Sequence, residues 1–131
     1  MKNKITLSVL LSFFGFCAFA QTIVTTNPEN RKVILEEFTG INCQFCPQGH
    51  AIAQGLQDNN PGNVYLVNIH SGGFAAPSGN QPDFRTPWGQ AIDNQSGLAG
   101  YPAGTINRQN FPGQEQGNAG TTALSRGAWA S

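Results

Sequence analysis

The fold is decided by residues 31–50, which read R-K-V-I-L-E-E-F-T-G-I-N-C-Q-F-C-P-Q-G-H. The apolar run at residues 33–35 predicts a strand over residues 32–39 that is buried on both faces of a sheet. Glu36 and Glu37 follow this run, and neighbouring residues of a strand point to opposite faces. We therefore predict that one of the two carboxylates is solvated and that the other is buried.

A tight turn then leads to Cys43 and Cys46, which form a C-x-x-C pair. We predict that Cys43 begins a helix that runs to about Asp58. Pro47 fits the first turn of this helix, where its missing N–H has no helical partner to lose. The sequence N-N-P-G at residues 59–62 contains strong helix breakers and ends the helix.

Residues 64–70, V-Y-L-V-N-I-H, predict a second strand. A strand, a helix and another strand make a βαβ unit, so we expect the two strands to be parallel. Residues 83–95 predict a short helix, and residues 103–108 predict a third strand. Three side chains of the short helix are expected to face inward: Trp88, Ala91 and Ile92.

The C-terminal part begins with a polar loop at residues 110–120. Thr121 or Thr122 would then cap a last helix. Its apolar positions are Ala123, Leu124, Ala128 and Trp129. We expect no further strand, and the order of elements predicts an α/β domain.

Residues 1–20 have the features of a secretory signal peptide. Two lysines precede an apolar run at residues 5–16, which is too short to span a bilayer as a stable helix. The A-x-A sequence at residues 18–20 matches a cleavage site, and cleavage there also removes Cys17. The alternative is a buried N-terminal helix. We therefore divide the chain into a signal peptide (1–20), a leader (21–31) and one domain (32–131).

Charge and hydropathy exclude several classes of partner. Without the two lysines of the signal peptide the net charge is −2, and no basic patch is present, so nucleic acid is not expected as a partner. No second hydrophobic segment follows residue 20, so we expect no transmembrane segment after signal cleavage.

The cysteine pair is better explained by reactivity than by stapling. Export places Cys43 and Cys46 in a compartment where disulfides form, but closing so small a loop constrains the unfolded chain little. A cysteine at a helix N-terminus is made more acidic by free N–H groups and the helix dipole. Cys43 would then attack a substrate disulfide, and Cys46 would resolve the mixed disulfide.

A C-x-x-C at the mouth of a βαβ unit resembles the redox site of the thioredoxin superfamily. In that family a buried acid lies six residues before the first cysteine and moves protons for the second; Glu37 has this spacing, although Glu36 competes for the buried position. The family also places a cis-proline loop against the cysteines, and Tyr101-Pro102 is similar to it. The resemblance implies that Pro102 helps to present the substrate backbone.

Residues 33–108 are more specifically similar to the outer-membrane protein 28-related family of exported thioredoxin-like proteins. The similarity rests on the motifs E-E-F-T-G-I-N-C-x-x-C-P-x-G-H, V-N-I-H and Y-P-A-G-T-I-N-R. It implies an α/β, thioredoxin-like fold with a central mixed sheet flanked by helices. Members of the family commonly carry more chain, so we expect the domain to be truncated at its C-terminus.

These features predict an exported thiol–disulfide oxidoreductase that acts on protein disulfides and needs no cofactor. It would work in the periplasm, at the outer membrane or at the cell surface, with protein thiols and a membrane-anchored redox protein as partners. The candidate site has four catalytic and two substrate-binding residues: Cys43, Cys46, Glu37 and Pro102, with Tyr101 and Phe45.

Two other functions fit the same residues. In a non-catalytic outer-membrane or surface binding protein, the cysteine pair would be an inert disulfide that locks the start of the helix. In a metal carrier, Cys43, Cys46, His50 and His70 would hold zinc or Cu(I). Pro47 follows the C-x-x-C in place of histidine, which excludes the c-type haem pattern.

Overall fold

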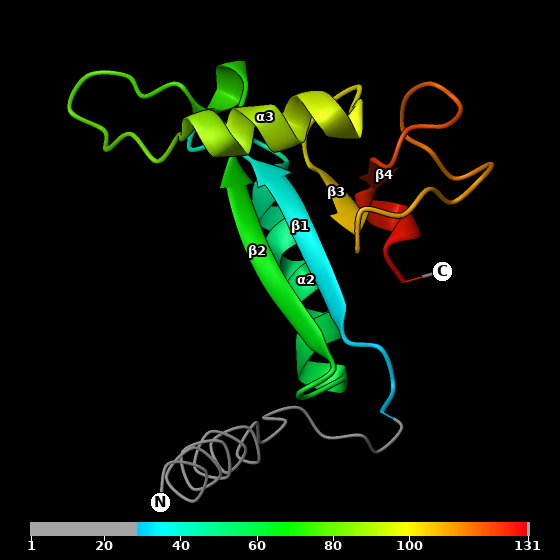
Figure 1. Cartoon of the computed structure of the whole chain (residues 1–131). Coiled ribbons are helices and arrows are strands. Elements are labelled where there is room, and N and C mark those ends of the chain that lie inside the picture. Colours follow the sequence, from blue (N-terminus) through cyan, green and yellow to red (C-terminus); the bar gives the residue numbers. More distant parts are fainter. Residues whose placement is uncertain (1–28, 131) are drawn as a thin grey trace, which may run out of the picture.

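The computed structural model describes residues 29–130, so the expected signal peptide and most of the leader lie outside the described residues. Within these residues the chain forms six helices and strands and two short 3₁₀ turns, at Gly73–Ala75 and Arg126–Ala128 (Figure 1). In chain order the helices and strands are β1 Val33–Thr39, α2 Cys46–Asn59, β2 Val64–His70, α3 Pro87–Ser96, β3 Ala103–Ile106 and β4 Leu124–Ser125.

The four strands form one mixed sheet in the order β2-β1-β3-β4. β1 and β2 are parallel, from Val33 opposite Val64 to Thr39 opposite His70. β3 pairs antiparallel with the other edge of β1, and β4 pairs antiparallel with β3. The predicted βαβ unit and the α/β class with a central mixed sheet are therefore confirmed.

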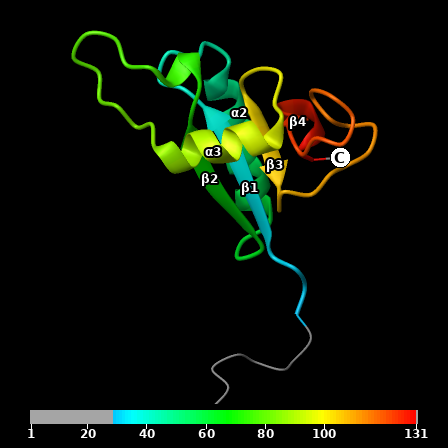
Figure 2. The ribbon, with the colours of Figure 1, turned by 45° about the horizontal axis from the view of Figure 1, so that its top comes forward.

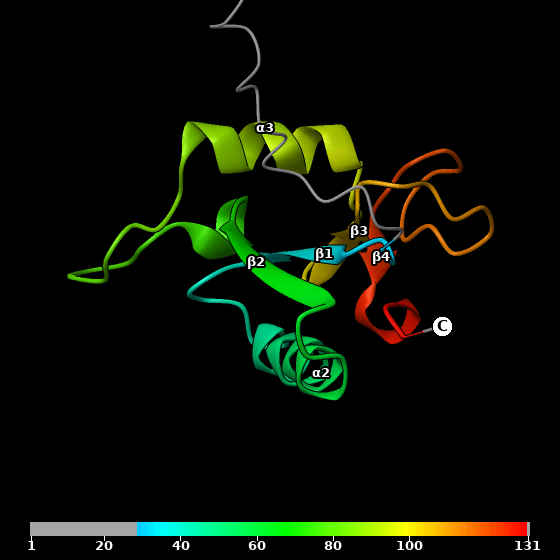
Figure 3. The ribbon, with the colours of Figure 1, turned by 60° about the horizontal axis from the view of Figure 1, so that its bottom comes forward.

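Helices cover both faces of this sheet. α2 lies along one face and α3 crosses the other, so the domain has three layers (Figures 2 and 3). Within residues 29–130 no helix is long and apolar enough to cross a bilayer.

The hydrophobic core is divided by the sheet into two clusters. On the α2 face Leu35 packs with Ala53, and on the α3 face Phe38 packs with Ile69 and the partly buried Ile92. Leu35 and Phe38 can serve opposite faces because side chains alternate along a strand. β1, with the sheet on both edges and helices on both faces, is thus the centre of the domain.

Helix α2 begins at Cys46, not at Cys43 as predicted. A helix that began at Cys43 would need an N–H at residue 47 to donate to the Cys43 carbonyl, and Pro47 has none. Two turns instead precede the helix: the Cys43 amide donates to the Gly40 carbonyl at 3.0 Å, and the Cys46 amide donates to the Cys43 carbonyl at 3.4 Å. Cys43 therefore lies just before the helix.

Helix α3 begins four residues later than the predicted range and ends one residue beyond it, at Ser96, and it exposes more of its surface than we expected. Thr86 caps it, accepting a hydrogen bond from the Gly89 amide at 2.9 Å. Ile92 faces the sheet as predicted, whereas Trp88 is 80% exposed and Ala91 is also exposed. The inward face is the stripe of residues 89, 92 and 96, spaced three or four apart, and Trp88 lies beside this stripe in the first turn, where it stays exposed.

The predicted last helix and the predicted absence of a further strand are both wrong. Leu124 pairs with Gly104 in the sheet, and only a 3₁₀ turn, Arg126–Ala128, follows. The approach to β4 is held by the Ser96 carbonyl, which accepts from the amides of Thr122 and Ala123 at 3.2 and 3.1 Å. The edge of β3 that faces away from β1 pairs with Leu124 and Ser125 through backbone hydrogen bonds. The apolar spacing of residues 123–129 predicts a helix because it carries no information about this distant pairing.

The third strand ends at Ile106, two residues earlier than predicted. Asn107 and Arg108 both have φ of 52°, in the left-handed region that ends a strand. The Asn107 side chain still serves β1, because its Oδ1 accepts from the Ile34 amide at 2.8 Å.

The two-sided packing of β1 can be tested with Phe38→Ala. Phe38 is fully buried, so its removal should lower the free energy of unfolding by about 3–5 kcal/mol, measured by urea denaturation. Trp88→Ala is the control, and it should change stability by less than about 0.5 kcal/mol because Trp88 is exposed. Equal losses in the two variants would contradict the observed orientation of α3.

Candidate functional site

Cys43 and Cys46 form a disulfide at the start of α2, with an S–S distance of 2.04 Å and a Cα–Cα distance of 5.4 Å. Cys46 is the first residue of the helix, and Cys43 lies in the turn before it. The disulfide therefore brings the Cys43 sulfur to the helix terminus, where unpaired N–H groups favour a thiolate. Both residues are largely covered, with 8% of Cys43 and 1% of Cys46 exposed.

The turn that carries Cys43 is held by the segment after β2. Gly40 packs directly on the backbone of Phe74, where any Cβ would overlap the Phe74 carbonyl. The Asn42 amide donates to the Phe74 carbonyl at 2.9 Å, and the Asn42 side chain donates to the Ala76 carbonyl at 2.8 Å. These contacts fix the position of the first cysteine relative to the carboxyl ends of β1 and β2.

Glu37 lies on the α2 face of β1 and is 1% exposed. His50 Nδ1 lies 2.9 Å from Glu37 Oε2, and His50 Nε2 lies 3.2 Å from the Thr39 hydroxyl. Glu37, His50 and Thr39 thus form a hydrogen-bonded group that we call the acid–histidine cluster. The side chain of His50 is 41% exposed, so the cluster runs from a buried carboxyl to solvent.

Gly49 brings Glu37 and Pro102 together. A Cβ on Gly49 would lie 2.6 Å from Glu37 Oε1 and 3.1 Å from the Pro102 ring. Because Gly49 follows Cys46 by three residues, this contact lies on the same face of α2 as Cys46. Glycine at this position allows the carboxyl and the proline ring to reach the helix beneath the disulfide.

The carboxyl of Glu37 is held in a poorly solvated place. Its Oε1 is buried and has no hydrogen-bond partner within the described chain. Burial raises the pKa of Glu37 above its ordinary value, and the charge and hydrogen bond of His50 oppose this rise without cancelling it. Glu37 can therefore hold its proton at a higher pH than an exposed carboxyl and act as an acid or a base.

The Tyr101–Pro102 peptide bond is cis, and Pro102 is buried. The Tyr101 hydroxyl donates to Asp93 on α3, and the Tyr101 ring makes an edge contact with Phe74, with ring centres 5.9 Å apart. Burial, followed by the Asp93 hydrogen bond, raises the pKa of Tyr101 to about 12. The Tyr101 side chain therefore anchors the proline loop to α3.

Phe45, between the two cysteines, is 59% exposed. The guanidinium of Arg126 lies 6.0 Å from the centre of its ring, at the outer limit of a cation–π contact. Phe45 and the exposed Phe74 present aromatic surface beside the turn that carries Cys43.

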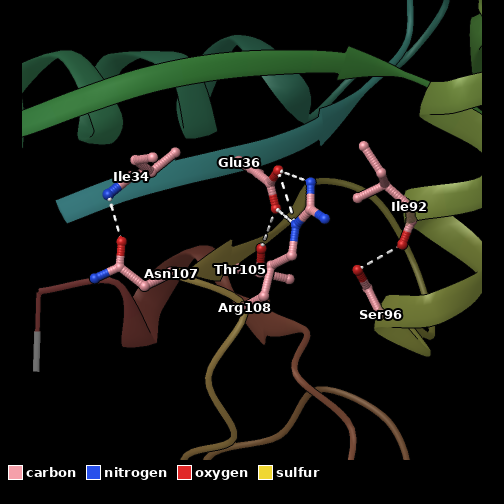
Figure 4. Close-up of polar contacts among 7 residues, drawn as sticks. All are labelled: Ile34, Glu36, Ile92, Ser96, Thr105, Asn107 and Arg108. Atoms are coloured by element: carbon pink, nitrogen blue, oxygen red, sulfur yellow. Dashed lines mark hydrogen bonds and ion pairs between the residues drawn. The ribbon is translucent and has the colours of Figure 1, made fainter. Parts of the chain in front are cut away.

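Glu36 is also buried, so the prediction that one carboxylate is solvated is wrong. It faces the α3 side, where Arg108 donates to it from Nε at 2.8 Å and from Nη2 at 2.5 Å (Figure 4). The Thr105 hydroxyl donates to the same carboxylate at 2.9 Å. The Arg108 hydrogen bonds hold the pKa of Glu36 below its ordinary value despite burial. Of the two acids, Glu37 is the one on the disulfide side.

His70, at the end of β2, does not join a metal site. Its Nδ1 is buried without a hydrogen-bond partner among residues 29–130, and its ring centre lies 5.1 Å from that of Phe84. Burial first, and the charge of His50 second, lower the pKa of His70. In the described part of the chain, no three His, Cys, Asp or Glu residues are placed to hold a metal ion, so the four-ligand alternative finds no support there.

Two cavities lie away from the disulfide. One, of about 390 Å³, is lined by Arg31, Lys32, Ile34, Glu36, Asn107 and Arg108. The other, of about 320 Å³, lies between the far ends of β1 and α2 and contains Leu56, Phe111 and Trp129. Neither includes a cysteine, so the chemistry of the disulfide is not enclosed in either cavity.

Sequence reasoning identified the cysteines, Glu37 and Pro102, and the structure brings all four to one end of α2. It gave Gly49 no part in the site, and it gave His50 a part only in the metal-carrier alternative. The available signal was helical spacing, since residues three and four positions after Cys46 share its face. Comparisons with protein-family models, with curated proteins and with solved structures found no match to this chain. The chemistry of the site therefore follows from its geometry.

The burial of Glu37 should be visible in the pH dependence of stability. Its pKa is higher in the folded chain than the unfolded value of 4.5, so the unfolded chain loses the proton first as pH rises. Stability should fall above pH 4.5 until the folded carboxyl also ionises, by about 1.4 kcal/mol for each unit of pKa difference. Urea titrations of Glu37→Gln should lack this fall.

The control for that measurement is Asp58→Asn, which changes an exposed acid on α2. This variant should keep the pH dependence of the wild-type chain. If Glu37→Gln and the wild-type chain showed parallel stability curves between pH 4 and pH 8, the carboxyl would not be buried as observed.

The Glu36–Arg108 pair should give stability the opposite dependence on pH, because the pKa of Glu36 is lowered whereas that of Glu37 is raised. Arg108→Ala leaves the buried Glu36 carboxylate without its cation, so the free energy of unfolding at pH 7 should fall by roughly 1–2 kcal/mol. This value lies in the lower part of the range for an unpaired buried charge, because the Arg108 side chain is half exposed and water screens the ion pair. The pair lowers the pKa of Glu36, so its contribution is complete above 4.5 and is lost as pH falls through the folded value.

Urea denaturation at pH 7 and at pH 3 would measure both effects of Arg108→Ala. Arg85→Ala is the matched control, because its partner Asp83 is exposed and their ion pair is screened by water. A loss that is no larger than the control, or that does not shrink in acid, would contradict a buried role for the pair.

Proposed function

We propose that the protein is an exported, thioredoxin-like thiol–disulfide oxidoreductase that acts on protein disulfides. One observation carries this proposal: the Cys43–Cys46 disulfide lies at the start of α2, and Glu37 and Pro102 meet beneath the same face of that helix at Gly49. Thiol–disulfide exchange needs a sulfur pair that can be oxidised and reduced, and it is helped by a carboxyl that can give or take a proton. The proline loop lies against the same helix.

The arrangement of strands supports a thioredoxin-like interpretation of the fold. α2, which starts at the C-x-x-C pair, connects the parallel strands β1 and β2. The Tyr101-Pro102 loop leads into β3, which is antiparallel to β1. The sequence motifs around residues 36–50 and 101–108 add the proposed relationship to the outer-membrane protein 28-related family.

The proposed reaction starts from the disulfide seen in the structure. A substrate thiolate attacks the Cys43 sulfur, the Cys43–Cys46 bond breaks, and Cys46 leaves as a thiolate that takes a proton from Glu37. A second substrate thiolate then attacks the substrate sulfur of the mixed disulfide and releases Cys43 as a thiolate. Two electrons pass from the substrate dithiol to the protein, and the reverse sequence reduces a substrate disulfide.

The two cysteines have different roles in this scheme because their surroundings differ. Cys43 precedes the helix and is the more exposed of the pair, so it is the sulfur that meets substrate. Cys46 is the more buried and lies on the face of α2 that Glu37 approaches, so it is the sulfur that exchanges a proton. Exposed Phe45 and the backbone beside Pro102 would contact the substrate chain.

Export is part of the proposal and rests on the sequence of residues 1–20. Delivery to the periplasm, the outer membrane or the cell surface would place the disulfide where oxidised cysteines persist. Protein thiols and disulfides, and a membrane-anchored redox protein, are the partners that this location implies.

A second candidate function is a non-catalytic surface binding protein in which the disulfide is structural. The low exposure of Cys43, at 8%, favours it, because a nucleophilic sulfur must reach its substrate. The two candidates differ in whether Cys43 forms bonds to other proteins.

Trapping with Cys46→Ala decides between them. This variant keeps Cys43 but cannot resolve a mixed disulfide, so an oxidoreductase should accumulate covalent adducts that run as slower bands without reductant. Cys43→Ala is the matched control, and it should trap far fewer proteins because Cys46 is 1% exposed. Equal, low adduct levels in both variants would refute the oxidoreductase and support the structural disulfide.

A further inference from the structure

His50 occupies a distinctive place beside the disulfide. Within the described chain it is the one hydrogen-bond partner of the Glu37 carboxyl, through Nδ1 and Oε2 at 2.9 Å. Its other ring nitrogen meets the hydroxyl of Thr39, which is 1% exposed. His50 follows Cys46 by four residues, so it shares the face of α2 that carries the buried sulfur.

We propose that His50 is the positioning residue of the site: it holds the Glu37 carboxyl beneath Cys46 and exchanges its proton with solvent. This inference rests on the proposed redox function. It assigns a role to a residue outside the cysteine pair, the acid and the proline, and it makes the sulfur chemistry depend on pH through His50.

The acid–histidine cluster can move a proton without moving heavy atoms. When Glu37 is ionised, Nδ1–H donates to Oε2, while Nε2 accepts from the Thr39 hydroxyl in the neutral ring or donates to it in the imidazolium. When Glu37 is protonated, its O–H donates to Nδ1 and Nε2–H donates to Thr39. The hydroxyl can donate or accept, so both states keep every hydrogen bond. The 41% exposure of the His50 side chain gives the proton a path to water.

Among residues 29–130, no other titratable group on the elements packed around Glu37 takes this role. β3 presents Gly104 opposite Glu37, and β2 presents Asn68. His70 lies at the end of β2 and makes no hydrogen bond to the carboxyl. On the other face of the sheet Glu36 is bound to Arg108. From α2 come His50 and the disulfide, so the charge that acts on Glu37 is that of His50.

The balance of the step is simple. When the disulfide opens, Glu37 gives its proton to the Cys46 thiolate and becomes a carboxylate. His50 then takes a proton from water at Nδ1 to become an imidazolium, and it passes that proton to Glu37, which leaves the neutral ring with its proton on Nε2. The attacking substrate thiol supplies the electrons, so the step needs no other reductant.

The experiment measures reduction of the Cys43–Cys46 disulfide by dithiothreitol in the full chain from pH 4 to pH 9. The rate constant, corrected for the thiolate fraction of dithiothreitol, should fall at least about tenfold as Glu37 loses its proton and no acid serves Cys46. In His50→Gln the midpoint of this fall should move up by about one pH unit, because the charge and the hydrogen bond by which His50 favours the carboxylate are gone.

Two matched variants complete the design. Glu37→Gln should abolish the fall, and Gln48→Ala, an exposed change on the same helix, should leave the midpoint where it is in the wild-type chain. A His50→Gln variant that keeps its melting temperature and keeps the wild-type midpoint would overturn the inference.

If His50→Gln does not fold, nuclear magnetic resonance of the wild-type chain provides the test. The carboxyl carbon of Glu37 and the ring protons of His50 should shift over the same pH range. Independent shifts would overturn the inference.

Failure of the proposed function would look different. The dithiothreitol assay needs no protein substrate, and the resonance measurement needs no sulfur reaction. If the pH measurements show that His50 controls Glu37 but Cys46→Ala traps no protein, the role of His50 is supported and the proposed oxidoreductase function is refuted.

Discussion

Two adjacent carboxylates, Glu36 and Glu37, are buried on opposite faces of the central strand, and most of the polar structure follows from satisfying them. A buried charge is costly unless a partner compensates it. On the α3 face the partners are Arg108 and Thr105, which tie the end of β3 to β1. On the α2 face the partner is His50, and it leaves one carboxylate oxygen without a hydrogen bond.

The two acids therefore have opposite electrostatic roles. The guanidinium of Arg108 lowers the pKa of Glu36, so Glu36 stays ionised at neutral pH and its ion pair links the end of β3 to β1. Burial raises the pKa of Glu37, and His50 offsets only part of that rise, so Glu37 holds its proton to a higher pH than an exposed carboxyl. The difference separates a structural acid from one that can take part in chemistry, and it places the reactive acid on the face that carries the disulfide.

Small residues connect this acid to the sulfur pair. Gly49 lets Glu37 and the Pro102 ring approach α2 one turn after Cys46, and Gly40 lets the segment after β2 hold the turn before Cys43. Tyr101 fastens the proline loop to α3 through Asp93. The disulfide thus lies at the start of α2, close to the central strand and the proline loop, and neither of the two cavities described above includes a cysteine. This convergence is the strongest structural support for the proposed redox function.

The sequence by itself determined the two parallel strands, the mixed α/β arrangement, the place of the cysteine pair and the proline loop, because apolar runs, helix breakers and motif spacing are local signals. Tertiary structure alone decided the fate of both acids, the role of His50 and the strand at Leu124, because each depends on partners that are distant along the chain. Glu36 meets Arg108 across 72 residues, Glu37 meets His50 only once α2 packs on β1, and Leu124 becomes a strand because β3 offers an open edge. The start of α2 was within reach of the sequence, since the missing N–H of Pro47 forbids the hydrogen bond that a helix from Cys43 requires.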